Sequence, residues 1–269
     1  MSQHKSRKSN IALAVLGAIT AMASQSVLAH SSIPQDCQDA AKQAGLPLSS
    51  AVFVNPTTHT YVGTNPVGEL IIGTKTADEI TGTSGNDVIC GRGGPDTIHG
   101  LGGNDIIFGG NGADDVDGGD GNDTISGGND NDKLVGGRDD DTLNGDNGND
   151  VEDGSDGDDK VKGNQGNDLL AGSRGIDTLS GGQGSDTLTG GDDNDVLNGG
   201  KGPDTLAGGN GDDELNGDNG PDELDDDAGI EMFNGGHGND SIVDVEGNDQ
   251  NDEFDDAEDD GDLPDDEKS

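Results

Sequence analysis

The stretch GGDGNDTIS (118–126) decides the fold, because the chain repeats this pattern in register over most of its length. Starting at Gly73, the sequence divides into 20 consecutive blocks of nine residues that end at Asp252, without insertion or deletion. Position 6 is Asp in 19 blocks, position 1 is Gly in 18, and position 8 is apolar in 18. So strict a period argues against a disordered chain, which needs no register.

Each block has two parts with different backbone preferences. The first six residues carry Gly where the backbone must turn or approach another segment closely. The last three, such as Thr124-Ile125-Ser126, favour β-structure and place one apolar side chain in the middle. We therefore expect a three-residue strand with one inward-facing side chain in each block. Two blocks make one coil of 18 residues, and the repeats predict an all-β solenoid of about ten coils.

The composition indicates what holds such coils together. Among 269 residues there are 50 Gly, 57 acidic and only 13 basic side chains, and the formal net charge is −44. This charge excludes nucleic acid and anionic membrane surfaces as partners. A core one side chain thick, surrounded by like charge, does not fold unaided. A hard dication suits turns built of Asp carboxylates and Gly carbonyls, and Ca²⁺ is preferred to Mg²⁺, which keeps its waters.

The pattern resembles a known family. Blocks that begin at Gly109, Gly118, Gly181, Gly199, Gly208 and Gly235 match GGxGxD in full. The chain is therefore similar to the hemolysin-type (RTX) calcium-binding repeat proteins, whose signature is GGxGxDxUx with U a large apolar residue. The resemblance covers residues 73–252 and implies a parallel β-roll, a right-handed β-solenoid with Ca²⁺ in its turns.

The resemblance also implies a ligand set. Each ion would lie between the turns of blocks n and n+2, bound by backbone carbonyls and by the carboxylates at position 6, which allows up to about 18 Ca²⁺. The implied carboxylate ligands are Asp78, Asp87, Asp96, Asp105, Asp114, Asp123, Asp132, Asp141, Asp150, Asp159, Asp168, Asp177, Asp186, Asp195, Asp204, Asp213, Asp222 and Asp240.

In three blocks the departures from the pattern affect the expected core or the expected sites. Block 145–153 has Asp146 at position 2 and Glu152 at the apolar position, so we expect the core to be interrupted there. Blocks 226–234 and 244–252 lack the first Gly, and we expect weak or absent sites at both.

Residues 1–29 have the pattern of a secretory signal peptide. Basic residues at 5–8 precede an apolar run at 11–23, and Val27 and Ala29 place small side chains before a cleavage site. The apolar run is too short to span about 30 Å of hydrocarbon, which disfavours a membrane anchor. We expect a secreted, extracellular protein with no membrane insertion after the signal is removed; retention in the periplasm is the alternative.

The segments that flank the repeats differ from them. Residues 30–72 predict an N-terminal cap with a short helix at 35–44 and strands at 51–54 and 59–62, and residues 253–269 form an acidic tail. Both cysteines, Cys37 and Cys90, lie in the exported part, where an even count favours a disulfide; two free thiols are the alternative.

No catalytic motif is present. The sequence has neither HExxH nor GxSxG, and its His residues are scattered, so we expect no enzyme activity. A structural or adhesive role outside the cell is the leading hypothesis; a soluble calcium buffer and an accessory or secretion module for a separate enzyme are the alternatives. Some members of the family bind ice through regular Thr and Asn rows. Here position 3 of consecutive blocks reads Lys, Ser, Gly, Gly, Asn, Asp, Asn, Arg, which is no such row.

Overall fold

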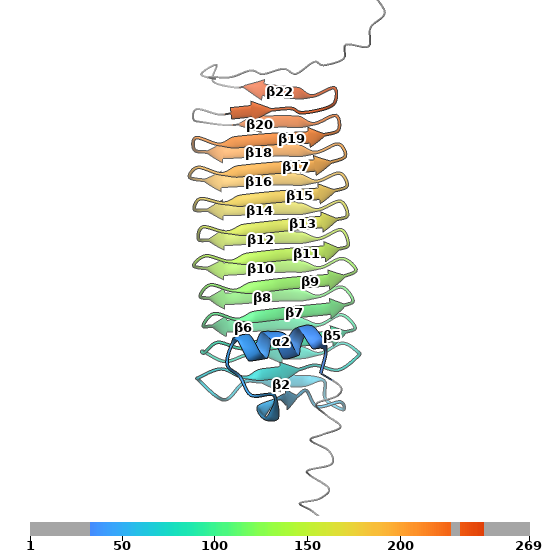
Figure 1. Cartoon of the computed structure of the whole chain (residues 1–269), viewed down its shortest axis with the longest axis vertical. Coiled ribbons are helices and arrows are strands. Elements are labelled where there is room, and N and C mark those ends of the chain that lie inside the picture. The colour runs from blue at the N-terminus through green and yellow to red at the C-terminus, as the bar shows by residue number, and fades with distance from the viewer. Residues whose placement is uncertain (1–32, 227–231, 245–269) are drawn as a thin grey trace, which may run out of the picture.

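The computed structural model describes residues 33–226 and 232–244, which form a column of stacked coils (Figure 1). Two parallel sheets of 11 strands each face one another and are joined by tight turns along both sides. The expected all-β parallel solenoid of about ten 18-residue coils is therefore confirmed. The segments predicted as signal peptide (1–29) and acidic tail (253–269), and nearly all of block 244–252, lie outside the described residues.

Odd-numbered strands make one sheet, which we call sheet 1, and even-numbered strands make the other, sheet 2. Sheet 1 contains β1 (Val52–Phe53), β3 (Leu70–Ile72), β5 (Val88–Gly93), β7 (Ile106–Asn111), β9 (Thr124–Asn129), β11 (Thr142–Asn147), β13 (Lys160–Gln165), β15 (Thr178–Gln183), β17 (Val196–Lys201), β19 (Glu214–Asn219) and β21 (Met232–Asn234). Sheet 2 contains β2 (Thr60–Val62), β4 (Glu79–Thr81), β6 (Thr97–Gly102), β8 (Asp115–Asp120), β10 (Lys133–Arg138), β12 (Val151–Asp156), β14 (Leu169–Arg174), β16 (Thr187–Asp192), β18 (Thr205–Asn210), β20 (Glu223–Asp226) and β22 (Ser241–Asp244).

The register within each sheet follows the repeat. In the pair β9–β11, Ile125 lies beside Leu143, 18 residues later. Most strands have six residues, so the expected three-residue strand was wrong: each strand continues into the first three residues of the next block. In β9 both Ile125 and Gly127 face inward and are buried. The second inward position is thus a glycine, for which the carboxylate rows described below give the reason.

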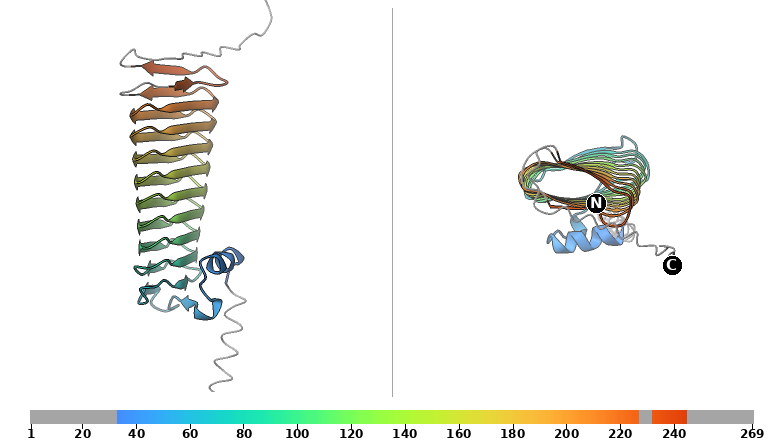
Figure 2. Two further views of the ribbon diagram at one scale, coloured as in Figure 1. Left: turned by 60° about the vertical axis from the view of Figure 1, so that its left-hand side comes forward. Right: turned by 90° about the horizontal axis from the view of Figure 1, so that it is seen from above.

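The interior is a single column of side chains, and the view along the axis shows how flat the roll is (Figure 2). Position 8 of each block supplies this column, from Ile71 and Ile80 near the start to Phe233 near the end. Isoleucines fill the early coils and leucines the later ones. Each coil therefore buries only about two apolar side chains, and packing alone contributes little stability per residue ordered.

The N-terminal segment packs against the outside of this column. Helix α2 (Gln35–Gln43) lies beside the first coils on the outer face of sheet 1, followed by η1 (Leu48–Ser50) (Figure 2). The buried side chains of α2, which include Cys37, pack against those of β3 and β5 in a second apolar cluster. A disulfide joins Cys37 to Cys90. Strands β1 and β2 add one coil below the repeats, with an offset of 19 residues to β3 and β4.

None of the helices in the described ranges 33–226 and 232–244 is long and apolar enough to cross a membrane.

Candidate metal centres

The position-6 aspartates form two straight rows, one along each edge of the roll. Turns that follow sheet 1 make the first edge, and turns that follow sheet 2 make the second edge. The first-edge row contains Asp78, Asp96, Asp114, Asp132, Asp150, Asp168, Asp186, Asp204, Asp222 and Asp240. The second-edge row contains Asp87, Asp105, Asp123, Asp141, Asp159, Asp177, Asp195 and Asp213. All of these except Asp240, which is half-buried, are buried.

Each row is a ladder of identical hydrogen bonds. The backbone N–H of Asp96 donates to Oδ1 of Asp114 over 2.8 Å, and the N–H of Asp105 donates to Oδ1 of Asp123 over 2.7 Å. The pattern continues at 18-residue intervals along both edges. Oδ2 has no hydrogen-bond partner and is buried in Asp96, Asp105, Asp114, Asp123, Asp132, Asp141, Asp150, Asp159, Asp168, Asp177, Asp186, Asp195, Asp204 and Asp222.

A glycine beneath each carboxylate makes room for it. A Cβ on Gly127 would lie 2.4 Å from Oδ2 of Asp132, so the second inward position of the strand must be glycine for the carboxylate to turn inward. Backbone carbonyl oxygens lie close to the same carboxylates. A Cβ on Gly118 would lie 2.4 Å from Oδ2 of Asp123 and 2.7 Å from the carbonyl oxygen of Gly136 in the next coil. Carboxylate and carbonyl oxygens therefore approach the same inward-facing glycine.

Burial raises the pKa of these carboxyl groups and so disfavours their ionised form when no cation is bound. Desolvation, together with the charges of neighbouring aspartates, raises the pKa of Asp105 and Asp132 to about 8, although the backbone N–H of the preceding row member acts in the opposite direction. The same causes raise the pKa of Asp141 to about 8. Buried negative charges of one sign need either protons or metal ions.

The donor set fits a hard cation with many oxygen ligands. Within the two described ranges, no three Asp, Glu, His or Cys side chains converge to form a site by themselves. A cation bound at a regular step would therefore need backbone carbonyl oxygens in addition to the aspartate carboxylates. Six to eight oxygen ligands in an adaptable arrangement are what Ca²⁺ accepts.

The first member of each row differs from the others. Oδ2 of Asp78 accepts a hydrogen bond from the N–H of Thr74, and its Oδ1 lies 3.0 Å from Nδ1 of His59. Oδ2 of Asp87 likewise accepts one from the N–H of Thr83, whose hydroxyl donates to Oδ1. Both carboxylates are thus satisfied by the protein. The sequence contains the residues responsible, Thr at position 2 in GTKTAD (73–78) and GTSGND (82–87), but the repeat pattern alone does not predict that they bond to the aspartates.

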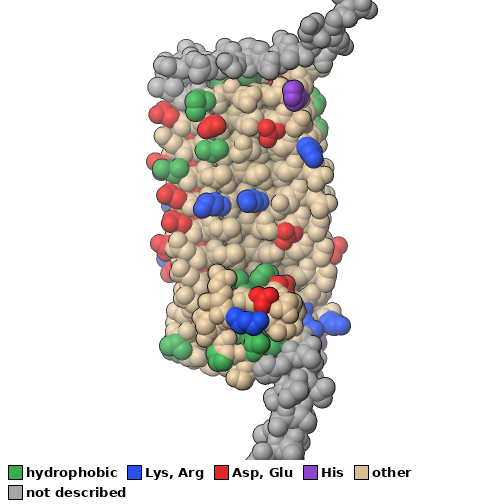
Figure 3. Space-filling model, in the orientation of Figure 1, with side chains coloured by type: hydrophobic (Ala, Val, Ile, Leu, Met, Phe, Trp, Pro, Cys, Tyr) green, Lys and Arg blue, Asp and Glu red, His purple; other side chains and the backbone are tan. Residues whose placement is uncertain are grey.

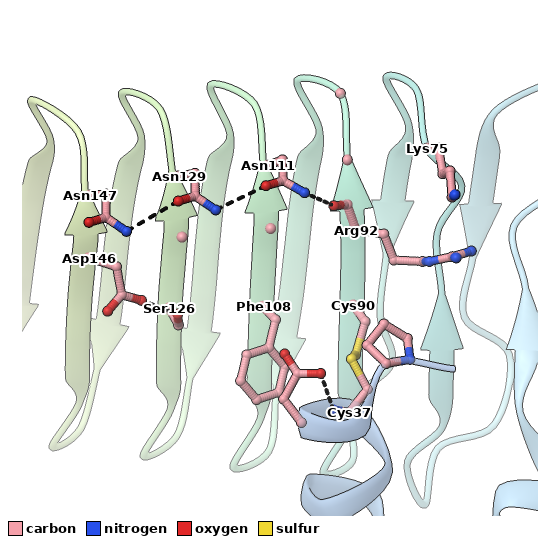
Figure 4. A pocket seen from close by; sticks show the side chains of 16 residues that line it. Cys37, Lys75, Cys90, Arg92, Phe108, Asn111, Ser126, Asn129, Asp146 and Asn147 are labelled. Atoms are coloured by element: carbon pink, nitrogen blue, oxygen red, sulfur yellow. Dashed lines mark hydrogen bonds between the residues drawn. A yellow bond between two sulfur atoms is a disulfide. The ribbon is translucent and has the colours of Figure 1, made fainter. Parts of the chain in front are cut away.

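The outer face of sheet 1 carries a row of amides, and this corrects one expectation. Asn129 Nδ2 donates to Asn111 Oδ1 over 2.9 Å, and Asn147 Nδ2 donates to Asn129 Oδ1 over 3.2 Å (Figure 4). The row continues to Gln165. Asn111, Asn129 and Asn147 line a groove of about 780 Å³ beside α2. Reading position 3 along consecutive blocks hid this row, because neighbours in a sheet are 18 residues apart and not nine.

Sheet 2 uses the same position differently. Arg138 pairs with Asp120 and Arg174 with Asp156, each at 2.7 Å, so opposite charges alternate along its outer face. On the face that carries α2, acidic side chains gather mainly along the edge of the roll and few lie in its middle (Figure 3).

The comparison with protein families agrees with this geometry. A family model described as the RTX calcium-binding nonapeptide repeat (4 copies) matches the chain in overlapping segments from residue 68 to residue 224, which is more than half of its length. No curated protein matches the chain.

Proposed function

Because the chain belongs to the RTX calcium-binding nonapeptide repeat family, we propose that it folds on binding a series of Ca²⁺ ions along both edges of the roll. The carboxylates at position 6 and the turn carbonyls hold the ions. One observation carries this proposal: in most row members between Asp96 and Asp222, Oδ2 is buried and has no hydrogen-bond partner among the described residues. Such groups cost free energy unless something binds them.

The Oδ1 atoms and the Oδ2 atoms have separate tasks. Oδ1 accepts the N–H of the aspartate one coil below and thereby sets the register between coils. Oδ2 lies against the inward-facing glycine of the same block and is left for a cation. Bound Ca²⁺ supplies the positive charge that lets adjacent carboxylates stay ionised in a buried row. Mg²⁺ suits the turns less well, since it demands octahedral geometry and retains several waters.

We expect fewer than the maximum of about 18 ions, because the first position of each row is a poor site. Asp78 and Asp87 already use both carboxylate oxygens within the protein, so the first position of each edge is weaker or empty. The remaining row members are the ligands we propose, and Asp240 is the last of them.

Cation-dependent folding supports an export role. At submicromolar Ca²⁺ the chain stays unfolded and passes through an export channel led by the signal peptide, and it folds when it meets external Ca²⁺. The mature protein then acts without catalysis, as a structural or adhesive element at or outside the cell surface. Its long, flat faces and its rigid column of coils suit such a role better than a pocket for chemistry.

Three alternatives make different predictions. A soluble calcium buffer binds ions independently and without a cooperative transition. An accessory or secretion module raises the activity or yield of a separate enzyme. Ice binding is the third alternative, and the regular amide row on sheet 1 is the feature that favours it. A freezing-hysteresis assay on the calcium-loaded chain tests for ice binding.

Equilibrium dialysis with Ca²⁺ and with Mg²⁺ tests the proposal. We expect more than ten Ca²⁺ per chain, bound cooperatively, and little Mg²⁺ at the same concentration. Binding of only a few ions, or equal binding of both metals, contradicts it. A broad hydrolase screen on the calcium-loaded chain tests the non-enzymatic part.

A further inference from the structure

Glu152 is an acidic side chain inside the core column. It lies in β12 with its neighbours in register, Leu134 of β10 on one side and Leu170 of β14 on the other. Its side chain is 1% exposed, as fully buried as the leucines around it. Every other described side chain at this position from Ile71 onward is apolar. The expected interruption of the core is thus one of charge, because the stack itself continues through Glu152.

Within the described residues, no hydrogen bond or ion pair compensates this carboxyl group. Neither of its oxygens has a hydrogen-bond partner. No Lys, Arg or His in the described residues pairs with it, and the nearby Lys160 and Lys162 on β13 point to solvent. A buried, unpaired carboxylate is among the costliest groups in a core, and an apolar residue here would remove that cost. The carboxyl group at this position therefore needs either a proton or a bound cation.

The two aspartates at the near edge are the groups that act on Glu152 most directly. Burial, reinforced by the charges of Asp150 and Asp168 and to a smaller extent by that of Asp146, raises its pKa to about 9. The N–H of Gly145 favours the ionised form, without reaching hydrogen-bond geometry. A Cβ on Gly145 would also lie 2.4 Å from Oδ2 of Asp150. Glu152 and Asp150 thus approach the same point of the facing strand.

The aspartates themselves are joined as one step of the first-edge row. The N–H of Asp150 donates to Oδ1 of Asp168 over 2.9 Å, and Oδ2 of both residues is buried and unpartnered. Three carboxyl groups with free oxygens consequently face the interior at this step, and two do so at a regular step. The three do not yet converge on one point. Binding of one ion by all three therefore requires rotation about the side-chain bonds of Glu152.

We propose that Glu152 is a third carboxylate ligand for the cation held between Asp150 and Asp168, reaching the edge site from inside the core. The inference rests on the proposed function, because it needs cations in the turns. A third carboxylate strengthens the attraction for a hard cation, so this step holds its ion more tightly than regular steps do. The site then fixes one ion near the middle of the roll.

Stepwise removal of calcium from the full chain tests this inference. Glu152→Gln keeps the shape of the side chain and removes its charge, and Glu152→Leu restores the apolar pattern of the repeat. Glu214→Gln, at an exposed glutamate on β19, is the matched control. The wild-type chain and the control should retain one Ca²⁺ against a chelator concentration about tenfold higher than the other ions withstand. Both Glu152 variants should lose that ion together with the rest.

Two results overturn different parts of the account. If wild type binds no Ca²⁺ and does not fold with it, the proposed function fails. If wild type folds with Ca²⁺ but Glu152→Gln and Glu152→Leu release their last ion at the same chelator concentration as wild type, the role of Glu152 is overturned and the proposed function stands. A crystal structure of the calcium-loaded chain gives a direct check, since an oxygen of Glu152 should lie about 2.3–2.6 Å from the ion.

Discussion

The backbone N–H of Asp123 donates to Oδ1 of Asp141 over 2.7 Å, while Oδ2 of Asp141 is buried without a partner. One carboxylate thus both fixes the register between two coils and presents a free oxygen to the turn. Repeated along both edges, this relationship explains why a thin core and a strongly negative charge occur in one stable fold. The aspartates organise the stack, and cations remove the cost of their charge.

Asp141→Asn separates these two tasks. An amide keeps the Oδ1 acceptor but loses the negative charge, so the register survives and cation binding weakens. We expect the calcium-loaded roll to lose about 2 kcal/mol of stability, which urea unfolding at saturating Ca²⁺ measures.

Asp140→Asn is the control for that substitution. Asp140 is the neighbouring residue in the same turn, but it is exposed and lies outside the row. We expect a change within about 0.5 kcal/mol. Equal losses for the two variants would show that general charge reduction, and not ligand removal, determines the effect.

The stability of the cation-free roll should depend on pH in the direction opposite to that of most proteins. Burial raises the pKa of row carboxyls from 3.8 to about 6 at Asp114 and to about 8 at Asp141. Between the unfolded pKa of 3.8 and the raised folded pKa, the folded chain binds more protons than the unfolded chain. Lowering the pH through this range therefore stabilises the fold. In chelator, circular dichroism should show β-structure increasing from pH 8 toward pH 4. A loss of β-structure over that range contradicts the burial of free carboxyls.

The first coils should be the least dependent on calcium. Asp78 and Asp87 are satisfied by Thr74 and Thr83, and α2 covers β3 and β5 with an apolar cluster. Hydrogen exchange in chelator should therefore be slower in α2, β3 and β5 than in β13–β19. Uniform exchange along the whole chain would refute this.

Reduction of the disulfide tests the same region. The bond between Cys37 and Cys90 spans 53 residues, and its loss should destabilise the first coils by about 4 kcal/mol in the chain-entropy model. Hydrogen exchange should then rise in α2 and β5, and that in β13–β19 at saturating Ca²⁺ should stay the same. Unchanged exchange in α2 would mean that the apolar cluster alone holds the helix.

Leu101→Gly should stabilise the roll. Leu101 stands at position 2 with φ of +83°, a conformation that favours glycine, and its side chain is 51% exposed. Relief of the backbone strain outweighs the small loss of contact, for a gain of about 1 kcal/mol at saturating Ca²⁺. A thermal melt compared with that of Gly119→Ala, at the equivalent position, checks the sign: the second substitution should destabilise.

Much of this architecture is readable from the repeat. Period, fold class, edge rows and the single apolar column all follow from Asp at position 6 and an apolar residue at position 8. The bounds predicted for helix α2 and for strands β1 and β2 also agree with the structure to within one or two residues. These features were accessible because each depends on local pattern.

Other features depend on which blocks become neighbours, and the sequence read block by block hid them. Asn111 and Asn129 are two blocks apart, yet they hydrogen-bond across adjacent strands. The length of the strands was missed because glycines at positions 1 and 2 look like turn residues, although Gly127 faces inward beneath Asp132. The depth at which Glu152 is buried likewise becomes visible only in three dimensions.

Far-ultraviolet circular dichroism of the chain, titrated with Ca²⁺ and in parallel with Mg²⁺ at neutral pH, tests the central claim most directly. The account predicts a sharp transition from coil to β-structure with Ca²⁺ and none with Mg²⁺ at the same concentration. A chain that is equally folded in chelator, or that stays unfolded at millimolar Ca²⁺, would contradict it.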